Sequence, residues 1–196
     1  MKPKLNLNKY IYTMKNAKQI GFTLLSTLLF FVGITFNACK TDKCKQVNCA
    51  YSGVCKEGTC ICQIGYEGEH CETVTRDKFK GLYAVDEDGT ISGTFQYALS
   101  VESGAKINEV RIKNLQNYFD TVLVSGVTYL DTLTIPLQTL SNGYQVEGYG
   151  YIVDTNPLNQ HYYQHAKVTF YYKVTDPLGI VNEYGSGGSQ PSIWSK

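Results

Sequence analysis

Apolar and polar residues alternate along most of the chain from about residue 79 onward. In GTFQYALSVE (93–102) an apolar side chain recurs at every second position, and NEVRIKN (108–114) repeats the pattern. A two-residue period places successive side chains on opposite faces of a β-strand. Similar stretches predict about eight strands, at residues 80–86, 93–102, 108–114, 120–125, 131–140, 143–153, 164–176 and 180–184. The pattern therefore predicts a mainly β fold.

Turn residues separate these apolar stretches, as in DEDGT (86–90), SNG (141–143) and DPLG (176–179). Pro136 has no N–H for a sheet ladder, which indicates an edge position or a bulge. Eight short strands joined by tight turns fold either as an antiparallel meander barrel or as a two-sheet sandwich. We expect the barrel over residues 79–186, with the sandwich as the alternative. The stretch GSGGSQPSIWSK is of low complexity, so we expect 187–196 to be a flexible tail.

The N-terminal segment has a different composition. Residues 1–38 carry five lysines and no acidic side chain, and an uncharged apolar run of 17 residues (20–36) precedes Ala38. A basic region, an apolar run and a small residue before a cleavage site are typical of an export signal. We expect 1–38 to be a signal peptide, with Met14 as an alternative start. A retained membrane anchor is the other interpretation, although the apolar run is slightly short for a span of about twenty residues.

All seven cysteines of the chain lie between Cys39 and Cys71. A segment this short cannot bury a core large enough to fold on, so its cysteine density indicates disulfides formed in an oxidising compartment. A structural zinc site is the alternative, but it needs ligand pairs such as C-x-x-C, and the sequence has none. Because seven is an odd number, at least one cysteine has no partner within the chain.

From Cys44 onward, six cysteines follow the spacing C-x4-C-x5-C-x4-C-x-C-x8-C and end in CQIGYEGEHC. This pattern closely resembles an EGF-like domain, which would span residues 44–71. The resemblance implies the disulfides Cys44–Cys55, Cys49–Cys60 and Cys62–Cys71. Loop closure gives each bridge at most about 3 kcal/mol of stabilisation. Gly65 would take a positive φ in a turn and Tyr66 would cover the small core. Residues 72–78 would be a polar linker to the β domain.

The EGF-like segment lacks the acidic residues of calcium-binding relatives. Such domains carry an acidic cluster just before the first cysteine, whereas TDKC offers only Asp42. The sequence therefore predicts no calcium site, and no other metal or cofactor site. His161 and His165 could share a strand face, but no third ligand accompanies them, so we expect solvated polar side chains there.

The unpaired cysteine follows the signal directly. Phe36-Asn37-Ala38-Cys39 resembles the lipobox of bacterial lipoproteins, although Phe36 and Asn37 depart from the usual residues. The resemblance implies that Cys39 carries lipid on its thiol and becomes the first residue of the mature chain, with 39–43 as its N-terminus. It further implies a lipid-anchored protein of the outer membrane of a Gram-negative bacterium, on the periplasmic or cell-surface side. Membrane lipid would then be a partner.

Without its first 38 residues the chain carries 13 basic and 17 acidic side chains. No basic patch with interleaved aromatic residues is left, which argues against nucleic-acid binding. Nucleophile motifs and phosphate-binding loops are absent from the sequence, so we expect no enzyme activity. The stretch KGLYAVDED followed by a meander resembles the lipocalin-like β domains of bacterial surface lipoproteins, in which an eight-stranded barrel is filled or holds one small ligand.

The expected function is binding or adhesion by a membrane-anchored surface lipoprotein, with a surface protein or a glycan as partner. The alternative is a lipocalin-like carrier of a small apolar ligand. Twelve of the sixteen tyrosines follow residue 79, and most of them fit strand packing. The candidates for binding lie in predicted loops or at strand ends: Tyr118 in LQNYFD, and Tyr162 and Tyr163 in NQHYYQH.

Overall fold

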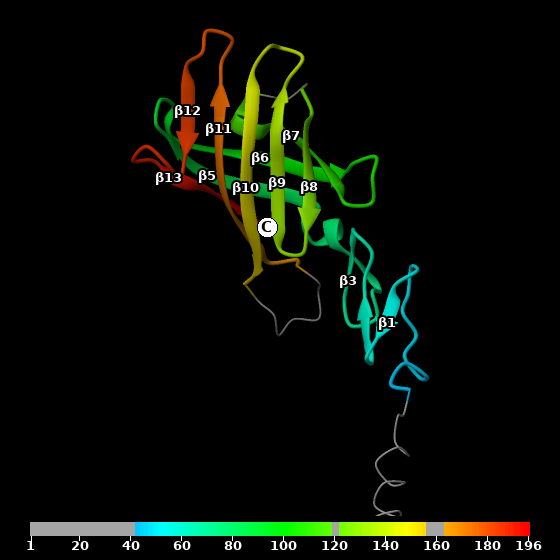
Figure 1. Ribbon diagram of the computed structural model, residues 1–196. Coiled ribbons are helices and arrows are strands. Elements are labelled where there is room, and N and C mark those ends of the chain that lie inside the picture. The colour runs from blue at the N-terminus through cyan, green and yellow to red at the C-terminus, as the bar shows by residue number, and fades with distance from the viewer. Residues whose placement is uncertain (1–41, 119–121, 156–162) are drawn as a thin grey trace, which may run out of the picture. The chain divides into compact units, whose positions relative to one another are not determined.

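The computed structural model describes residues 42–118, 122–155 and 163–196. The chain divides into two units, Met1–Lys43 and Cys44–Lys196. All the elements described below belong to the second unit, and Figure 1 labels its strands except β2 and β4. The predicted signal peptide and Cys39 lie outside the described residues. Among the residues that are described, no helix is long and apolar enough to cross a membrane.

A small disulfide-bonded module opens the second unit. Its strands β1 (Val54–Lys56) and β2 (Thr59–Ile61) form one antiparallel hairpin, and β3 (Tyr66–Glu67) and β4 (Thr73–Val74) form another. The disulfides are Cys44–Cys55, Cys49–Cys60 and Cys62–Cys71, the same pairs that the EGF resemblance implies. Gly65 has a φ of +94°, which suits a residue without Cβ. The Tyr66 ring stacks on that of Tyr51 at 4.5 Å.

Residues 72–78, expected as a polar linker, are ordered and partly buried. They form β4 and the 3-10 helix η1 (Thr75–Lys78). The Lys78 ammonium is almost fully buried between two carboxylates, at 2.8 Å from Glu67 and 2.6 Å from Asp131. Glu67 belongs to the module and Asp131 to the β domain. Because a buried charge is stable only when it is paired, this lysine ties the two parts together at the connection.

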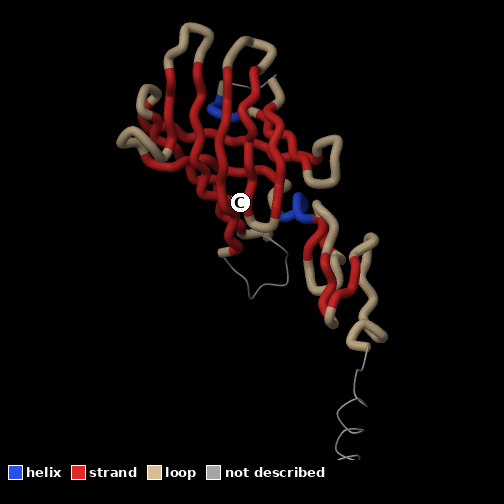
Figure 2. The backbone as a smooth tube through the Cα atoms, viewed as in Figure 1, coloured by secondary structure: helices blue, strands red, loops and turns tan. Residues whose placement is uncertain are grey.

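The β domain is a closed antiparallel β-barrel with eight strand positions, one of which is shared by two short strands. The predicted barrel is therefore confirmed over the sandwich. Its strands are β5 (Gly81–Gly89), β6 (Gly93–Ser103), β7 (Glu109–Lys113), β8 (Val124–Tyr129), β9 (Thr132–Thr139), β10 (Gln145–Asp154), β11 (Ala166–Thr175), β12 (Val181–Tyr184) and β13 (Gln190–Ser195). A second 3-10 helix, η2 (Leu115–Asn117), follows β7. Strands β5 to β11 pair in sequence order, and β13 closes the barrel between β11 and β5. Figure 2 shows the strands crossing around the closed sheet.

Two short strands, β12 and β13, share the eighth strand position of the barrel. Strand β12 pairs with the C-terminal part of β11 through Tyr184↔Tyr172, and β13 pairs with its N-terminal part through Ser192↔Phe170. The chain leaves the barrel between them at glycines with positive φ, beginning with Gly185. The prediction of a flexible tail over 187–196 is therefore wrong. Those glycines form the excursion, and the apolar residues after them return to the sheet.

Two local features of the strands depart from simple alternation. Pro136 lies at a bulge, because β9 advances three residues from Ile135 to Gln138 while β10 advances two. The predicted bulge is confirmed. The Gln138 side chain bonds both the backbone N–H and the C=O of Ser125. The predicted strand at 120–125 is wrong in its bounds, since β8 runs from Val124 to Tyr129 and its hairpin turn contains Leu130 with a φ of 47°.

Side chains fill the interior of the barrel. Large side chains are fully buried there, among them Tyr83 of β5, Leu99 of β6, Phe170 of β11 and Trp194 of β13. The Trp194 ring stacks on Phe170 at 4.6 Å and meets Tyr83 edge-on at 6.1 Å. Its Nε1–H donates to Ser192 Oγ at 2.9 Å. Strand β13 thus contributes Trp194, one of the largest side chains of the core.

Trp194→Ala should destabilise the protein strongly, because it removes a fully buried ring from a filled interior. We expect the free energy of unfolding to fall by about 3 to 5 kcal/mol. Denaturant unfolding followed by circular dichroism measures the change. The control is Leu178→Ala in the turn between β11 and β12, where the side chain is 85% exposed and a change within about 0.5 kcal/mol is expected. Equal stability of the two variants would contradict the core role of β13.

Candidate ligand-binding sites

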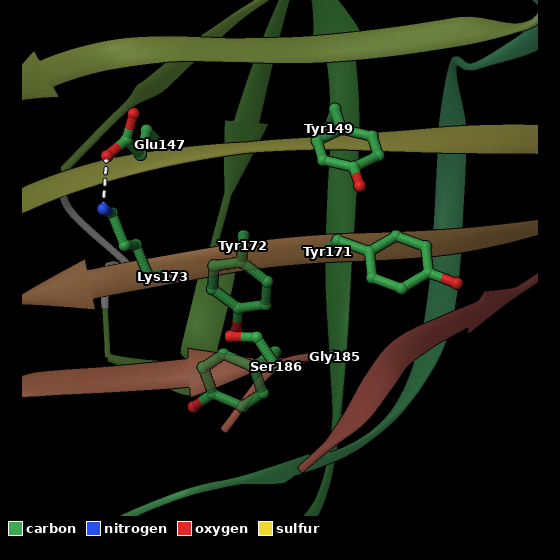
Figure 3. A pocket seen from close by; sticks show the side chains of 8 residues that line it. Glu147, Tyr149, Tyr171, Tyr172, Lys173, Gly185 and Ser186 are labelled. Atoms are coloured by element: carbon green, nitrogen blue, oxygen red, sulfur yellow. Dashed lines mark ion pairs between the residues drawn. The ribbon is translucent and has the colours of Figure 1, made fainter. Parts of the chain in front are cut away.

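A groove lies on the outer face of the barrel, next to the break between β12 and β13. We call it the outer groove. Its lining residues are Glu147, Tyr149, Tyr171, Tyr172, Lys173, Tyr184, Gly185 and Ser186. Its volume is about 260 Å³. Figure 3 shows the residues of β10 and β11 side by side, with the end of β12 below them.

Two cross-strand pairs build the floor of the outer groove. Tyr149 of β10 lies directly opposite Tyr171 of β11, and their rings stack at 5.4 Å with 18° between the planes. Two residues along, Glu147 faces Lys173, and the carboxylate and ammonium form an ion pair at 2.9 Å (Figure 3). The hydrogen bond to Glu147 raises the pKa of Lys173. Tyr149 is 47% exposed, so an aromatic surface and a charged pair lie next to each other in contact with solvent.

Glycines explain why these tyrosines face outward. In EGYGYIV, Gly148 and Gly150 occupy the inward positions of β10, where a Cβ would overlap Tyr172 and Phe170 respectively. Tyr149 and Tyr151 occupy the alternate, outward positions. At the edge of the groove, Gly185 has a φ of +85° and its missing Cβ leaves room for the Tyr171 ring. At each of these three positions an aromatic residue of β11 lies so close to the backbone that only glycine fits.

A second hollow lies at one end of the barrel, and we call it the rim pocket. Its lining residues are Glu87, Ser92, Phe95, Gln116, Tyr118, Tyr144 and Tyr184. It measures about 280 Å³. The Tyr118 and Tyr144 rings pack at 5.4 Å, which joins the residue after η2 to the turn between β9 and β10. Tyr184 also lines the outer groove, so its ring lies between the two hollows.

Glu87 is the buried acid of the rim pocket. Only 4% of the residue is exposed, and its Oε2 accepts hydrogen bonds from Tyr97 at 3.2 Å, Tyr172 at 2.9 Å and Ser192 at 2.9 Å. Its other oxygen, Oε1, is buried and receives no hydrogen bond within the described part of the chain. Burial raises the pKa of Glu87, and the three hydroxyl donors offset part of that rise.

The N-terminal module is similar to a known domain family. Residues 46–74 match the family model of the teneurin-like EGF domain. The match covers the six paired cysteines except Cys44 and extends into β4, whose pairing with β3 completes the second hairpin. The EGF-like module is thus defined by sequence match, disulfide pattern and strand pairing together.

The sequence-predicted binding residues do not form one site. Tyr118 lines the rim pocket, at the end of the barrel that contains Tyr144. Tyr163 lies at the opposite end, where its hydroxyl bonds Asp131 at 3.3 Å and its ring lies 5.5 Å from the Lys78 ammonium. Burial and Asp131 raise the pKa of Tyr163 to about 12. Its contacts are those of a structural residue, and Tyr162 lies outside the described residues.

Three residues of these sites were not predicted from the sequence: Glu87, Tyr149 and Tyr171. The run DEDG (86–89) predicts a turn, but β5 continues to Gly89 and the turn comprises residues 90–92. Glu87 therefore points inward, in register with Tyr83 and Val85. Tyr149 and Tyr171 fit strand packing equally well from sequence. The signal that could have separated them is the glycine at alternate positions in EGYGYIV, which marks the inward face.

Glu87→Gln should change how stability depends on pH. A carboxyl whose folded-state pKa is raised contributes stability that is complete below its unfolded pKa of about 4.5 and is lost as the pH rises through the folded value. Relative to the variant, the wild type should therefore lose stability as the pH increases from about 4.5. Urea unfolding at several pH values measures this difference. The exposed Glu69→Gln serves as control, and parallel pH profiles of wild type and Glu87→Gln would contradict the prediction.

Proposed function

We propose that this protein is a non-enzymatic, membrane-anchored surface protein that binds a glycan in the outer groove. The observation that carries the proposal is the stacked Tyr149–Tyr171 pair beside the Glu147–Lys173 ion pair. A pyranose ring has an apolar C–H face and a rim of hydroxyl groups. The tyrosine rings offer a flat apolar surface to the first, and the charged pair offers an acceptor and donors to the second.

The filled interior supports a surface-binding role over carriage of a large apolar molecule. Phe170 and Trp194 are fully buried at the centre of the barrel, where a bulky lipid chain would have to lie. The outer groove lies along β10 and β11 and is bounded by the end of β12, which suits a ligand that contacts the surface from outside. The carrier hypothesis is thereby confined to the rim pocket, which has room for a small ligand.

The anchor in this proposal is lipid on Cys39, and the location is the outer membrane of a Gram-negative bacterium. The support is the resemblance of residues 36–39 to a lipobox and the pairing of the other six cysteines with one another. A thiol modified by lipid avoids disulfide exchange in an oxidising compartment. The EGF-like module would then separate the barrel from the bilayer, with its three disulfides maintaining its shape.

Loss of either tyrosine of the stacked pair should weaken glycan binding. A glycan array identifies the best ligand of the full chain, and calorimetry then compares variants. We expect Tyr149→Ala and Tyr171→Ala each to raise the Kd at least about tenfold, which corresponds to about 1.4 kcal/mol of lost contact. Binding should depend weakly on salt, because the ligand is recognised mainly by stacking and neutral hydroxyls.

The matched control for this experiment is Tyr129→Ala. Tyr129 is a tyrosine of β8 that is 66% exposed and is absent from the lining of the outer groove. Its loss should leave the Kd unchanged. Glycan binding that survives both groove substitutions would refute the proposed function, and so would an array on which no glycan binds. Binding of a protein partner at the same groove, in place of a glycan, would also refute it.

Cys39→Ser should release the protein from membranes. Bacterial lipoproteins are held by several acyl chains, and two or more chains suffice for stable binding. Without the thiol there is no attachment point, so the variant should appear in the soluble fraction after a salt wash. The disulfides and the barrel should be unaffected, which circular dichroism and non-reducing mass analysis check. A variant that still sediments with membranes would contradict lipid attachment at Cys39.

A further inference from the structure

The rim pocket contains a buried acid whose hydrogen-bonding partners are arranged for the charged form. Gln116 donates its backbone N–H to the Tyr97 hydroxyl at 2.7 Å, and Trp194 donates its Nε1–H to Ser192 Oγ. Each of these hydroxyl groups has one proton, and with an N–H already directed at its oxygen it donates that proton to Glu87 Oε2. Such donors favour a carboxylate over a neutral carboxyl group.

This carboxylate has no cationic partner among the described side chains. None of the ion pairs in the described ranges includes Glu87. Its Oε1 is buried without a hydrogen bond from those residues, although the residue lines the rim pocket. A buried charge is normally paired, and a buried acceptor is normally satisfied. A ligand with a positive charge and an N–H group would meet both requirements.

The walls of the rim pocket suit the same kind of ligand. Four aromatic rings, those of Phe95, Tyr118, Tyr144 and Tyr184, line a space of about 280 Å³. The faces of aromatic rings are electronegative and attract an ammonium group, more strongly when water is excluded. The volume lies at the lower end of the range for small-molecule sites, which limits the ligand to a small molecule.

We propose that the rim pocket binds a small organic ammonium compound, whose N–H donates to Glu87 Oε1 while its apolar part lies against the aromatic rings. This site is separate from the glycan groove and goes beyond the proposed function. A bare divalent metal fits poorly, because Ca²⁺ and Mg²⁺ need several oxygen ligands and the described residues contain no group of three or more side chains placed to hold a metal.

Benzylammonium is a suitable probe, with two analogues that separate charge from hydrogen bonding. Benzyl alcohol retains the ring and a polar group but has no charge. Benzyltrimethylammonium keeps the charge but has no N–H. Calorimetry of the full chain at neutral pH should show saturable binding of benzylammonium, with both analogues binding at least about tenfold more weakly, as expected for loss of a charge-assisted hydrogen bond.

Substitutions locate the bound probe. Glu87→Gln retains the shape of the acid but not its charge, and should weaken benzylammonium binding at least about tenfold. Tyr118→Ala removes a wall residue that is 61% exposed, so its effect does not depend on a change in the core. It should weaken binding as well, whereas Tyr129→Ala should not. Circular dichroism establishes that each variant is folded.

The outcomes that overturn the proposal are specific. Absence of saturable binding, or equal binding of benzylammonium and benzyl alcohol, would exclude recognition of the charge. Equal binding of benzyltrimethylammonium would exclude the hydrogen bond to Oε1. If Glu87→Gln does not fold, undiminished binding in Tyr118→Ala would by itself exclude the rim pocket. Glycan binding is measured separately, so failure here leaves the proposed function intact, and the reverse also holds.

Discussion

The close packing of β11 rings onto β10 glycines determines both faces of the barrel wall. Phe170 and Tyr172 occupy space that a Cβ at Gly150 or Gly148 would need. Inward positions on this part of β10 must therefore be glycine, and the rings of the neighbouring strand fill the interior in their place. Strand geometry then directs Tyr149 to the outside, directly opposite Tyr171. The core and the outer groove are two consequences of one alternating pattern.

The interior is apolar near Trp194 and Phe170 and polar around Glu87, whose carboxylate accepts hydrogen bonds from Tyr97, Tyr172 and Ser192. Glu87 Oε1 is buried without a hydrogen bond from the described residues, and a buried group left so typically reduces stability by about 1 to 3 kcal/mol. Hydroxyl groups from three strands nonetheless converge on its other oxygen. An apolar residue at position 87 would fill the barrel without that cost. Proteins keep such costly groups mainly where binding or chemistry needs them, which is consistent with the ligand proposed for the rim pocket.

The parts of the structure that local sequence patterns determine could be predicted, whereas the parts that depend on contacts between distant residues could not. The six cysteines and the two-residue period are local, and they led to the module and the barrel. The low complexity of GSGGSQ predicts a flexible tail, but the apolar Ile193 and Trp194 that follow it pair with both β11 and β5, which lie far away in the sequence. Glu87 lies in DEDG, which predicts a turn because Asp and Gly are typical turn residues between apolar stretches. Its burial depends on Tyr97, Tyr172 and Ser192, from three other strands, which no local pattern reveals.

The module and the barrel are stabilised by different means, and Lys78 connects them. The module depends on three disulfides because it is too small for a core of its own, whereas the barrel has no cysteine and depends on apolar burial. The Lys78 ammonium is buried between Glu67 and Asp131, so losing either carboxylate would leave a buried charge only partly compensated. Correct placement of Glu67 requires the folded module. The pairing of the buried Lys78, which directly precedes the barrel, therefore depends on the disulfides of the module.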